Sequence, residues 1–310
     1  MTLAAILLLT SCAVDELSQS WQLDRTRILA VRATVTGATD PVLGTRAEPS
    51  PGDNVRFESL TYAPSDESIG GILWSVCVPE DPRAAGCELK DSDEEDTGKD
   101  EQISGIIGFE PLLPPEWDVP ETALDSLSQA DQKEGLTALV NLIVLSEEQL
   151  DDMESKETKD DLGDDLAAYE MAYKRIPVSN AETPNHNPDI YDFIVAGTPL
   201  NGAEGFTART EKIYTIEPVL APGHVETYAF TNSSGVTEYR AEQPYFDWYT
   251  EKGKNEDGER ASFDQEFTLH PFTTTEWTAP ESAGPVTLHI VVRDRRGGMG
   301  WASLSVNVLE

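Results

Sequence analysis

Four residues near the end of the sequence carry side chains suited to ligand binding: Arg293, Arg295, Arg296 and Trp301. Guanidinium groups bind anionic groups through paired hydrogen bonds, and an indole ring offers a flat apolar face. This cationic and aromatic cluster in an otherwise acidic chain predicts a contact with an anion or a carbohydrate. The alternative is that the arginines pair with neighbouring carboxylates and that Trp301 packs at the end of a sheet.

The same residues lie in and beside the turn of a predicted β-hairpin. Apolar residues occupy every second position on both sides of residues 294–300, which is the period of strands with one buried face. The turn contains three glycines, which allow the chain to reverse tightly. Because a hairpin alone is only marginally stable in water, a second sheet must cover its apolar face, and we predict a β-sandwich. The alternating residues are Val286, Leu288, Ile290 and Val292, then Ala302, Leu304, Val306 and Val308.

Further strands in both halves of the chain predict an all-β protein with two immunoglobulin-like β-sandwich domains. Trp74 lies within the third predicted strand and Trp248 within a strand of the second half. A buried tryptophan on the third strand resembles immunoglobulin-like sandwiches, although the inter-sheet cysteine pair of antibody domains is missing. The run 135–145 is apolar at nearly every position, which favours a central strand. The other predicted strands are residues 27–35, 55–62 and 71–78, then 190–196, 212–220, 225–230, 245–253 and 263–272.

Two segments of the first domain are not predicted to be strands. Residues 103–117 combine glycine, proline and apolar residues, which is typical of an irregular covering segment. Residues 161–174 carry leucine and tyrosine at spacings of three and four, which favours a short packed helix. Together with the surrounding charge runs they predict a long acidic, partly helical insertion at about residues 88–170.

A polar run with two prolines, residues 179–188, predicts the boundary between the domains. His186 lies in this run and is expected to be a solvated linker residue rather than a ligand. The predicted organisation is a signal peptide over residues 1–12, a tether over 13–24, a first domain over 25–180, a linker over 181–188 and a second domain over 189–310.

Three cysteines are present, and two of them flank a short turn-forming segment. In an exported protein Cys77 and Cys87 are expected to close this loop as a disulfide. The alternative, a zinc site, lacks the further histidine or cysteine ligands that zinc needs.

The charge is extreme, at −35 for 310 residues with a pI near 4.2. Such a surface repels nucleic acids and anionic lipids, which excludes them as electrostatic partners. The acidic run 91–101 is expected to be a solvated loop. Its alternative is weak calcium binding, and the candidate ligands are Asp91, Asp93, Glu95 and Asp96.

Nothing in the sequence indicates catalysis. The four histidines, His186, His224, His270 and His289, are scattered, and His289 is expected on the strand face opposite the core. Motifs for nucleophilic serines, phosphate loops and zinc-binding helices do not occur. We therefore expect a protein that is not an enzyme and carries no cofactor.

The first twelve residues carry information about where the protein is located. An apolar run at residues 3–9 has the length of a signal-peptide core and is too short to span a bilayer. Leu9-Thr10-Ser11-Cys12 follows it directly and resembles the lipobox of bacterial lipoproteins. The resemblance implies that Cys12 carries lipid chains and anchors the protein to a membrane, with Ala13 compatible with sorting to the outer membrane. The periplasmic and surface faces of that membrane stay open.

The last third of the chain resembles the closing half of PKD-like and related immunoglobulin-like domains of bacterial surface proteins. The resemblance rests on the strand around Trp248, on Trp277-Thr-Ala-Pro280, and on the strand 286–293 that leads into Asp294-Arg-Arg-Gly-Gly. The fuller PKD signature after the tryptophan is absent, because Trp248 is followed by Tyr-Thr-Glu-Lys.

These features predict a lipid-anchored envelope protein that acts as a non-catalytic binding or adhesion module for a protein or carbohydrate ligand. Loops of such sandwiches recognise ligands, and here the loops near residues 91–101 and 293–301 are the candidates. The alternatives are a structural subunit of an envelope complex and a carbohydrate-active hydrolase.

Overall fold

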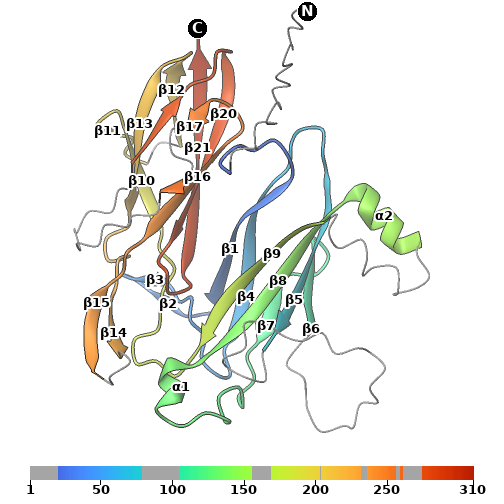
Figure 1. The fold of residues 1–310 in the computed structure, drawn as a ribbon, viewed down its shortest axis with the longest axis vertical. Coiled ribbons are helices and arrows are strands. Elements are labelled where there is room, and N and C mark those ends of the chain that lie inside the picture. The colour runs from blue at the N-terminus through green and yellow to red at the C-terminus, as the bar shows by residue number, and fades with distance from the viewer. Residues whose placement is uncertain are drawn as a thin grey trace, which may run out of the picture.

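The computed structural model describes residues 20–78, 105–155, 169–202, 204–231, 236–255, 259–260 and 274–310. Figure 1 shows two bodies of strands, one built from the first half of the chain and one from the second. We call them the N-terminal sandwich, residues 27–178, and the C-terminal sandwich, residues 190–309. Each has its own hydrophobic core.

The N-terminal sandwich consists of two sheets that face each other across a core around Trp74, which is fully buried. Strand β8 lies between β5 and β9 as a central strand, as predicted. One sheet has the order β1 (Arg27–Val35), β4 (Asn54–Tyr62), β7 (Glu116–Asp118). The other has the order β6 (Gly105–Glu110), β5 (Ile69–Cys77), β8 (Leu136–Ser146), β9 (Glu170–Val178).

The C-terminal sandwich also has two sheets, and its core contains the buried rings of Trp248 and Trp277. The predicted terminal hairpin is confirmed, with Val286 opposite Val306 and Leu288 opposite Leu304. One sheet has the order β11 (Thr198–Pro199), β10 (Ile190–Val195), β13 (Ile213–Leu220), β19 (Thr275–Thr278), β17 (Lys254–Asn255). The other has the order β12 (Gly205–Arg209), β21 (Met299–Leu309), β20 (Gly284–Arg293), β16 (Tyr245–Thr250), β18 (Glu259–Arg260).

The strand order in both sandwiches is that of immunoglobulin-like domains, in which strands A, B and E form one sheet and strands C, F and G the other. In the C-terminal sandwich β10, β13, β19 and β17 follow the order ABED, and β16, β20 and β21 follow CFG. In the N-terminal sandwich β1, β4 and β7 correspond to ABE, and β5, β8 and β9 to CFG. The immunoglobulin-like β-sandwich prediction is confirmed by this topology.

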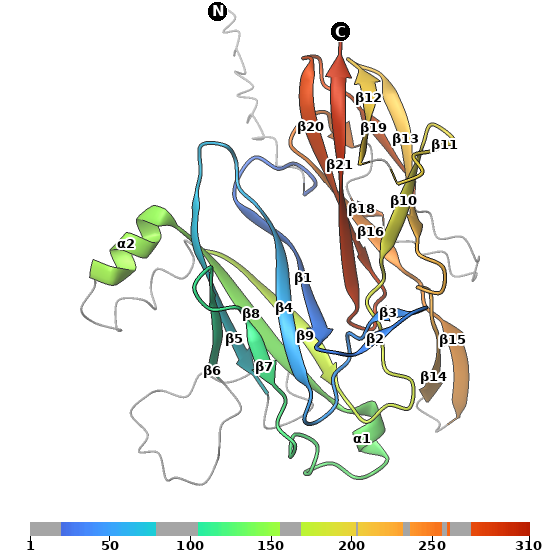
Figure 2. The same cartoon turned by 180° about the vertical axis from the view of Figure 1, so that it is seen from behind.

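Four smaller elements extend from this framework. The hairpin of β14 (Thr227–Thr231) and β15 (Thr237–Ala241) projects from the C-terminal sandwich in both views. A second hairpin joins β2 (Thr39–Asp40) to β3 (Gly44–Thr45). The helices α1 (Asp131–Glu134) and α2 (Glu147–Ser155) flank β8, and Figure 2 shows α2 on the side of the N-terminal sandwich away from the C-terminal one.

The predicted irregular segment and the predicted helix were both wrong where the structure describes them. Residues 105–110 and 116–118 form β6 and β7, because this segment pairs with β5 and β4 at the two sheets. Residues 170–174 belong to β9, where inward and outward residues alternate: Lys174 and Ile176 are buried while Met171 and Tyr173 are exposed. Pairing with β8 therefore overrides the helical spacing.

The predicted insertion at about residues 88–170 is corrected in the same way. Its described part contains β6, β7 and β8, which are strands of the sandwich rather than an addition to it. The acidic helix α2 lies inside this span, and the acidic run 91–101 lies outside the described residues. Likewise, the predicted strand at residues 225–230 forms β14 of the projecting hairpin instead of joining a sandwich sheet, and residues 263–272 are not described.

A small apolar cluster joins the two sandwiches. Leu29 and Ala30 of β1 are buried together with Val291 of β20 and with Leu23. A register shift between Ile28 and Ala30 marks the place where β1 departs from regular pairing with β4. The chain before β1 runs beside β16, since the Leu23 amide donates to the Thr250 carbonyl over 3.0 Å.

The end of the segment between the sandwiches is largely buried, contrary to the prediction of a solvated linker: residues 185, 187 and 188 are buried. Asn185 is completely buried and Asn187 is 4% exposed. The Asn187 side chain donates to the Ala33 carbonyl of β1 over 2.8 Å, and its amide oxygen accepts from the Met299 amide of β21 over 3.0 Å. One asparagine thus hydrogen-bonds to both sandwiches, which fixes their contact.

Candidate functional site

The β20–β21 turn at residues 294–298 organises the junction between the sandwiches. Asp294 is 2% exposed, and its Oδ1 accepts hydrogen bonds from the amides of Arg296, Gly297 and Gly298 over 2.7, 3.0 and 3.0 Å. The Asn185 side chain donates to its Oδ2 over 2.8 Å. Burial raises the pKa of Asp294, while these hydrogen bonds oppose the rise. The carboxylate therefore holds the turn in one shape.

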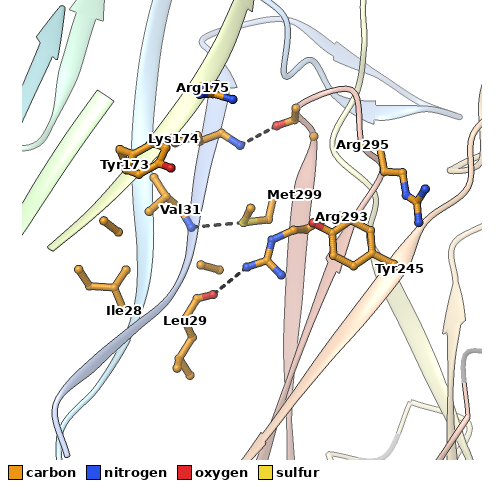
Figure 3. Close-up of a pocket in the computed structure, with 14 residues that line it drawn as sticks. Ile28, Leu29, Val31, Tyr173, Lys174, Arg175, Tyr245, Arg293, Arg295 and Met299 are labelled. Atoms are coloured by element: carbon orange, nitrogen blue, oxygen red, sulfur yellow. Dashed lines mark hydrogen bonds between the residues drawn. The ribbon is translucent and has the colours of Figure 1, made fainter. Parts of the chain in front are cut away.

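A cleft of about 500 Å³ lies where this turn meets β1 and β9. Figure 3 shows Tyr173, Lys174 and Arg175 on one side and Tyr245, Arg293 and Arg295 on the other. The volume is in the range typical of small-molecule sites. The lining consists of Ile28 to Val31 on β1, Ala172 to Arg175 on β9, Tyr245, Arg293, Arg295, and Gly297 to Met299.

The lining is cationic. It contains four basic side chains and no carboxylate, in a chain with 57 acidic and 22 basic residues. Tyr173 is 68% exposed, and the Tyr245 ring lies 5.8 Å from the guanidinium of Arg293 and 5.4 Å from that of Arg295. The cleft therefore combines positive charge with two aromatic faces.

Two of the four cations are held in the wall of the cleft. The Lys174 ammonium donates to the Gly297 carbonyl over 2.6 Å, and burial lowers the pKa of Lys174 to about 8. Arg293 forms an ion pair with Asp247 and donates to the Leu29 carbonyl over 3.2 Å. Burial also lowers the pKa of Arg293. Arg175 and Arg295 are exposed at the mouth.

On the other side of the turn, Arg296 lies among three carboxylates, which we call the carboxylate cage: Glu48, Glu226 and Glu242. Its Nη1 lies 2.9 Å from Glu226 and 2.9 Å from Glu242, and its Nη2 lies 3.9 Å from Glu48. All four side chains are at most 15% exposed. The cage joins both sandwiches to the base of the β14–β15 hairpin, because Glu226 precedes β14 and Glu242 follows β15.

The pKa values of Glu242 and Glu226 in the cage are shifted in opposite directions. Burial raises the pKa of Glu242 to about 7, with Asp294 adding to the rise and Arg296 opposing it. Burial alone would raise the pKa of Glu226 too, but the hydrogen bond and charge of His186, with the charge of Arg296, lower it overall. His186 lies 2.6 Å from Glu226 through its Nδ1, so it is a member of the junction and not a solvated linker residue.

The structure divides the four residues that the sequence singled out. Arg293 and Arg295 line the cleft, whereas Arg296 is enclosed by the cage. Trp301 packs under the guanidinium of Arg32, 4.3 Å from the ring centre, at the edge of the apolar junction. Arg296 and Trp301 thus fit the alternative in which the arginines pair with carboxylates and Trp301 packs against the protein. Arg293 both pairs with a carboxylate and lines the cleft.

Four lining residues were missed by sequence reasoning: Tyr173, Lys174, Arg175 and Tyr245. The first three are consecutive, and a tyrosine followed by two cations in an acidic chain was a signal that the helix prediction concealed. Their approach to Arg293 and Arg295 depends on contacts between the two sandwiches, which no local pattern contains.

The remaining predicted sites lie largely outside the described residues. Cys77 is disulfide-bonded, while its predicted partner Cys87 is not described. Cys12 and the calcium candidates at residues 91, 93, 95 and 96 are not described either. Within the described ranges no group of three or more histidine, cysteine or acidic residues is arranged to hold a metal ion.

His289 forms contacts within the protein. The His289 ring lies 2.9 Å from the Ser303 hydroxyl and meets the Tyr62 ring edge-on, and burial lowers its pKa. His270 is outside the described residues. In the part of the chain that is described, no helix has the length and apolar character needed to cross a membrane.

No model of a known protein family matches the chain, and no curated protein sequence matches it. Among solved structures it is similar to a nucleoside hydrolase-related hypothetical protein from Saccharophagus degradans, with 12% identity and a TM-score of 0.25, over 42% of this chain and 28% of that one. It is similar to fibronectin(III)-like modules of Clostridium thermocellum CbhA, with 10% identity and a TM-score of 0.24, over 89% and 93% of the two chains.

A third similar structure is that of the two tandem V-type regions of VCBP3, a v-region-containing chitin binding protein, with 12% identity and a TM-score of 0.27, over 90% and 99% of the two chains. Similarity at this level carries no argument about function. The strand order in both sheet pairs is what makes this chain an immunoglobulin-like β-sandwich protein.

Proposed function

We propose that the chain is a non-catalytic binding module of the bacterial cell envelope and that its ligand binds in the cleft between two immunoglobulin-like domains, residues 25–180 and 189–310. The observation that carries the proposal is the cleft itself: it lies between the two sandwiches and has cationic and aromatic walls. The contacts of Asn187, the carboxylate cage and the apolar cluster keep those walls in place without a ligand. A preformed site of this kind lowers the ordering cost of binding.

Binding accounts for the lining better than catalysis does. Its residues include no histidine, cysteine, serine, threonine or carboxylate, so the usual nucleophiles and acid–base pairs are missing from it. Lys174 has a lowered pKa, but it is 7% exposed and donates to a backbone carbonyl. The cleft thus offers hydrogen-bond donors and aromatic surface rather than reacting groups.

The envelope location rests on the lipobox-like sequence before Cys12. In the proposal Cys12 carries the lipid, and a short segment links it to the first sandwich on the periplasmic or surface side of an outer membrane. Mass spectrometry of the N-terminal peptide from a bacterial membrane fraction tests this. We expect an acylated Cys12 and release of the Cys12→Ser protein from the membrane, and an unprocessed Met1 in the soluble fraction would contradict the anchor.

The binding function is tested with two matched tyrosines. Tyr173 lines the cleft and Tyr191 lies on β10 outside it, and their side chains are 68% and 69% exposed. The full chain carrying Cys12→Ser is titrated with a panel of neutral and acidic oligosaccharides and acidic peptides. We expect Tyr173→Ala to weaken binding of any ligand about tenfold while Tyr191→Ala leaves it unchanged. Equal effects of the two substitutions would place the ligand elsewhere.

A structural role in an envelope complex is the second candidate, and the β14–β15 hairpin favours it. This hairpin projects from the body and exposes Tyr239 to 80% and Val236 to 55%. A photo-crosslinking amino acid at position 239 tests the role in cells. A discrete crosslinked partner, absent when the same group stands at position 191, would support a subunit function.

A further inference from the structure

The cleft is lined by basic residues although the chain as a whole is strongly acidic. Acidic residues outnumber basic ones by 57 to 22, yet the lining contains four basic residues and none that is acidic. Elsewhere in the junction the same chain supplies carboxylates freely, as the cage around Arg296 shows. Positive charge concentrated in a concave site attracts an anionic ligand.

The four basic residues of the cleft differ in their surroundings and in their exposure. The charge of Arg293 is balanced by Asp247. Lys174 lies in the wall beside Asp294, with Arg293 as a further charged neighbour. Arg175 and Arg295 are exposed on different walls of the cleft, and a planar guanidinium group suits a carboxylate bidentately.

The two tyrosines narrow the ligand class. Tyr173 is largely exposed on β9, and Tyr245 packs beside Arg293 and Arg295. A small inorganic anion would use the arginines and leave the rings without a role. A molecule with flat, partly apolar rings and anionic substituents uses both, and sugar rings with carboxylates have this combination.

We propose that the ligand of the cleft is an oligosaccharide that carries carboxylate groups. Arg175 and Arg295 bind its carboxylates from the two walls, Lys174 supplies further positive charge between them, and Tyr173 and Tyr245 pack against its sugar rings. The inference rests on the proposed binding function and names the chemistry of its ligand.

The test titrates the full chain carrying Cys12→Ser by calorimetry. The acidic probes are trisaccharides of galacturonate, mannuronate and glucuronate, maltotriose is the neutral probe, and sulfate and a short polyglutamate peptide are the other anions. We expect at least one uronate trisaccharide to bind at least tenfold more tightly than maltotriose, and its affinity to fall with added salt. Sulfate and polyglutamate are expected to bind weakly.

Charge variants place the binding in the cleft. Arg175→Gln and Arg295→Gln are each expected to reduce uronate affinity about tenfold. Arg56→Gln is the matched control, because Arg56 is an exposed arginine of β4 outside the cleft, paired with Glu116. Circular dichroism and the melting temperature show whether each variant is folded.

The outcomes separate this inference from the function on which it rests. Equal binding of maltotriose and uronates, lost in Tyr173→Ala, would keep the binding cleft and overturn the acidic ligand. Tighter binding of polyglutamate would keep the cleft and overturn the carbohydrate. Sulfate binding alone would show a simple anion site and overturn the inference as well. A panel without any ligand, or binding that neither arginine variant nor Tyr173→Ala reduces, would overturn both proposals.

Discussion

Arg295 and Arg296 are neighbours in one turn, yet they have opposite surroundings. Arg296 is buried among Glu48, Glu226 and Glu242 and joins both sandwiches to a hairpin. Arg295 is exposed beside Tyr245 at a cleft whose lining has no carboxylate. The turn that Asp294 holds separates the two side chains.

The difference shows that one turn can serve structure on one side and binding on the other. In the carboxylate cage Arg296 is paired with buried carboxylates, so its removal is expected to destabilise the fold. Arg295, by contrast, is exposed at a cleft whose lining has no carboxylate, so its removal is expected to affect a ligand more than the fold. Substitutions on the two sides of the turn are therefore expected to separate stability from affinity.

The largest effect is expected for Arg296→Ala. It leaves three carboxylates close together with little solvent, and removing one partner of a buried ion pair costs about 3–5 kcal/mol. Urea denaturation followed by tryptophan fluorescence measures the loss. Arg295→Ala is the neighbouring control, with an expected change below about 0.5 kcal/mol, and similar losses for both would erase the contrast.

A smaller loss of stability, about 3 kcal/mol, is expected for Asp294→Ala, because it leaves buried amides of the turn without an acceptor. Unlike Arg296→Ala, this substitution also releases the wall that contacts Lys174, so we expect stability and ligand affinity to fall together. Unfolding curves and calorimetry on the same protein check both. Loss of stability with unchanged affinity would show that the cleft does not depend on the turn.

The pH dependence of stability distinguishes the cage from the cleft. The pKa of Glu242 is raised to about 7, so the folded state binds a proton that the unfolded state releases above about pH 4.5. Its contribution to stability is therefore present at low pH and is lost as pH rises through 7. Glu242→Gln should gain about 2 kcal/mol relative to the wild type between pH 5 and pH 8. A constant difference across that range would contradict the assignment.

Among the substitutions of buried charged residues, the smallest effect on stability is expected for Lys174→Met. The pKa of Lys174 is lowered to about 8, so the folded state is penalised for a buried charge below pH 8 and the penalty is relieved as pH rises toward 10.5. Methionine removes the charge but also the hydrogen bond to Gly297, and we expect a net change below about 1 kcal/mol. Affinity for an anion should still fall severalfold. In the wild type, affinity should weaken above pH 8, as Lys174 loses its proton beside Arg293 and Asp294.

The sandwich could be predicted because its strands carry their pattern locally. Val286 to Val292 alternate, and Trp74 and Trp248 lie mid-strand, so period and composition were sufficient. Residues 170–174 were wrongly predicted to be helical because the spacing of leucines and tyrosines in this part of the sequence fits a helix. Pairing with β8 determines their structure instead. Such pairing depends on distant residues that a local window does not contain.

Two of the six cationic and aromatic residues of the candidate site could be found in the sequence for the same reason. Arg293 and Arg295 were recognised because they stand in a short cluster, whereas Tyr173 and Lys174 come from a distant strand. Asn185 and Asn187 looked like a solvated linker because polar residues and prolines are typical of one. Their burial follows from hydrogen bonds to both sandwiches, and these exist only after the halves meet.

The order in which the chain is made gives the junction a further consequence. The Val31 amide on β1 donates to the sulfur of Met299, 268 residues later in the sequence, and Leu29 is buried by Val291. While the ribosome is still producing the last hairpin, the first core can already close, but this strand edge has no cover. An open edge is a template for pairing with other chains. The final residues therefore cover the exposed edge of β1. A nascent or truncated protein that lacks them is expected to aggregate more readily, and it cannot form the cleft.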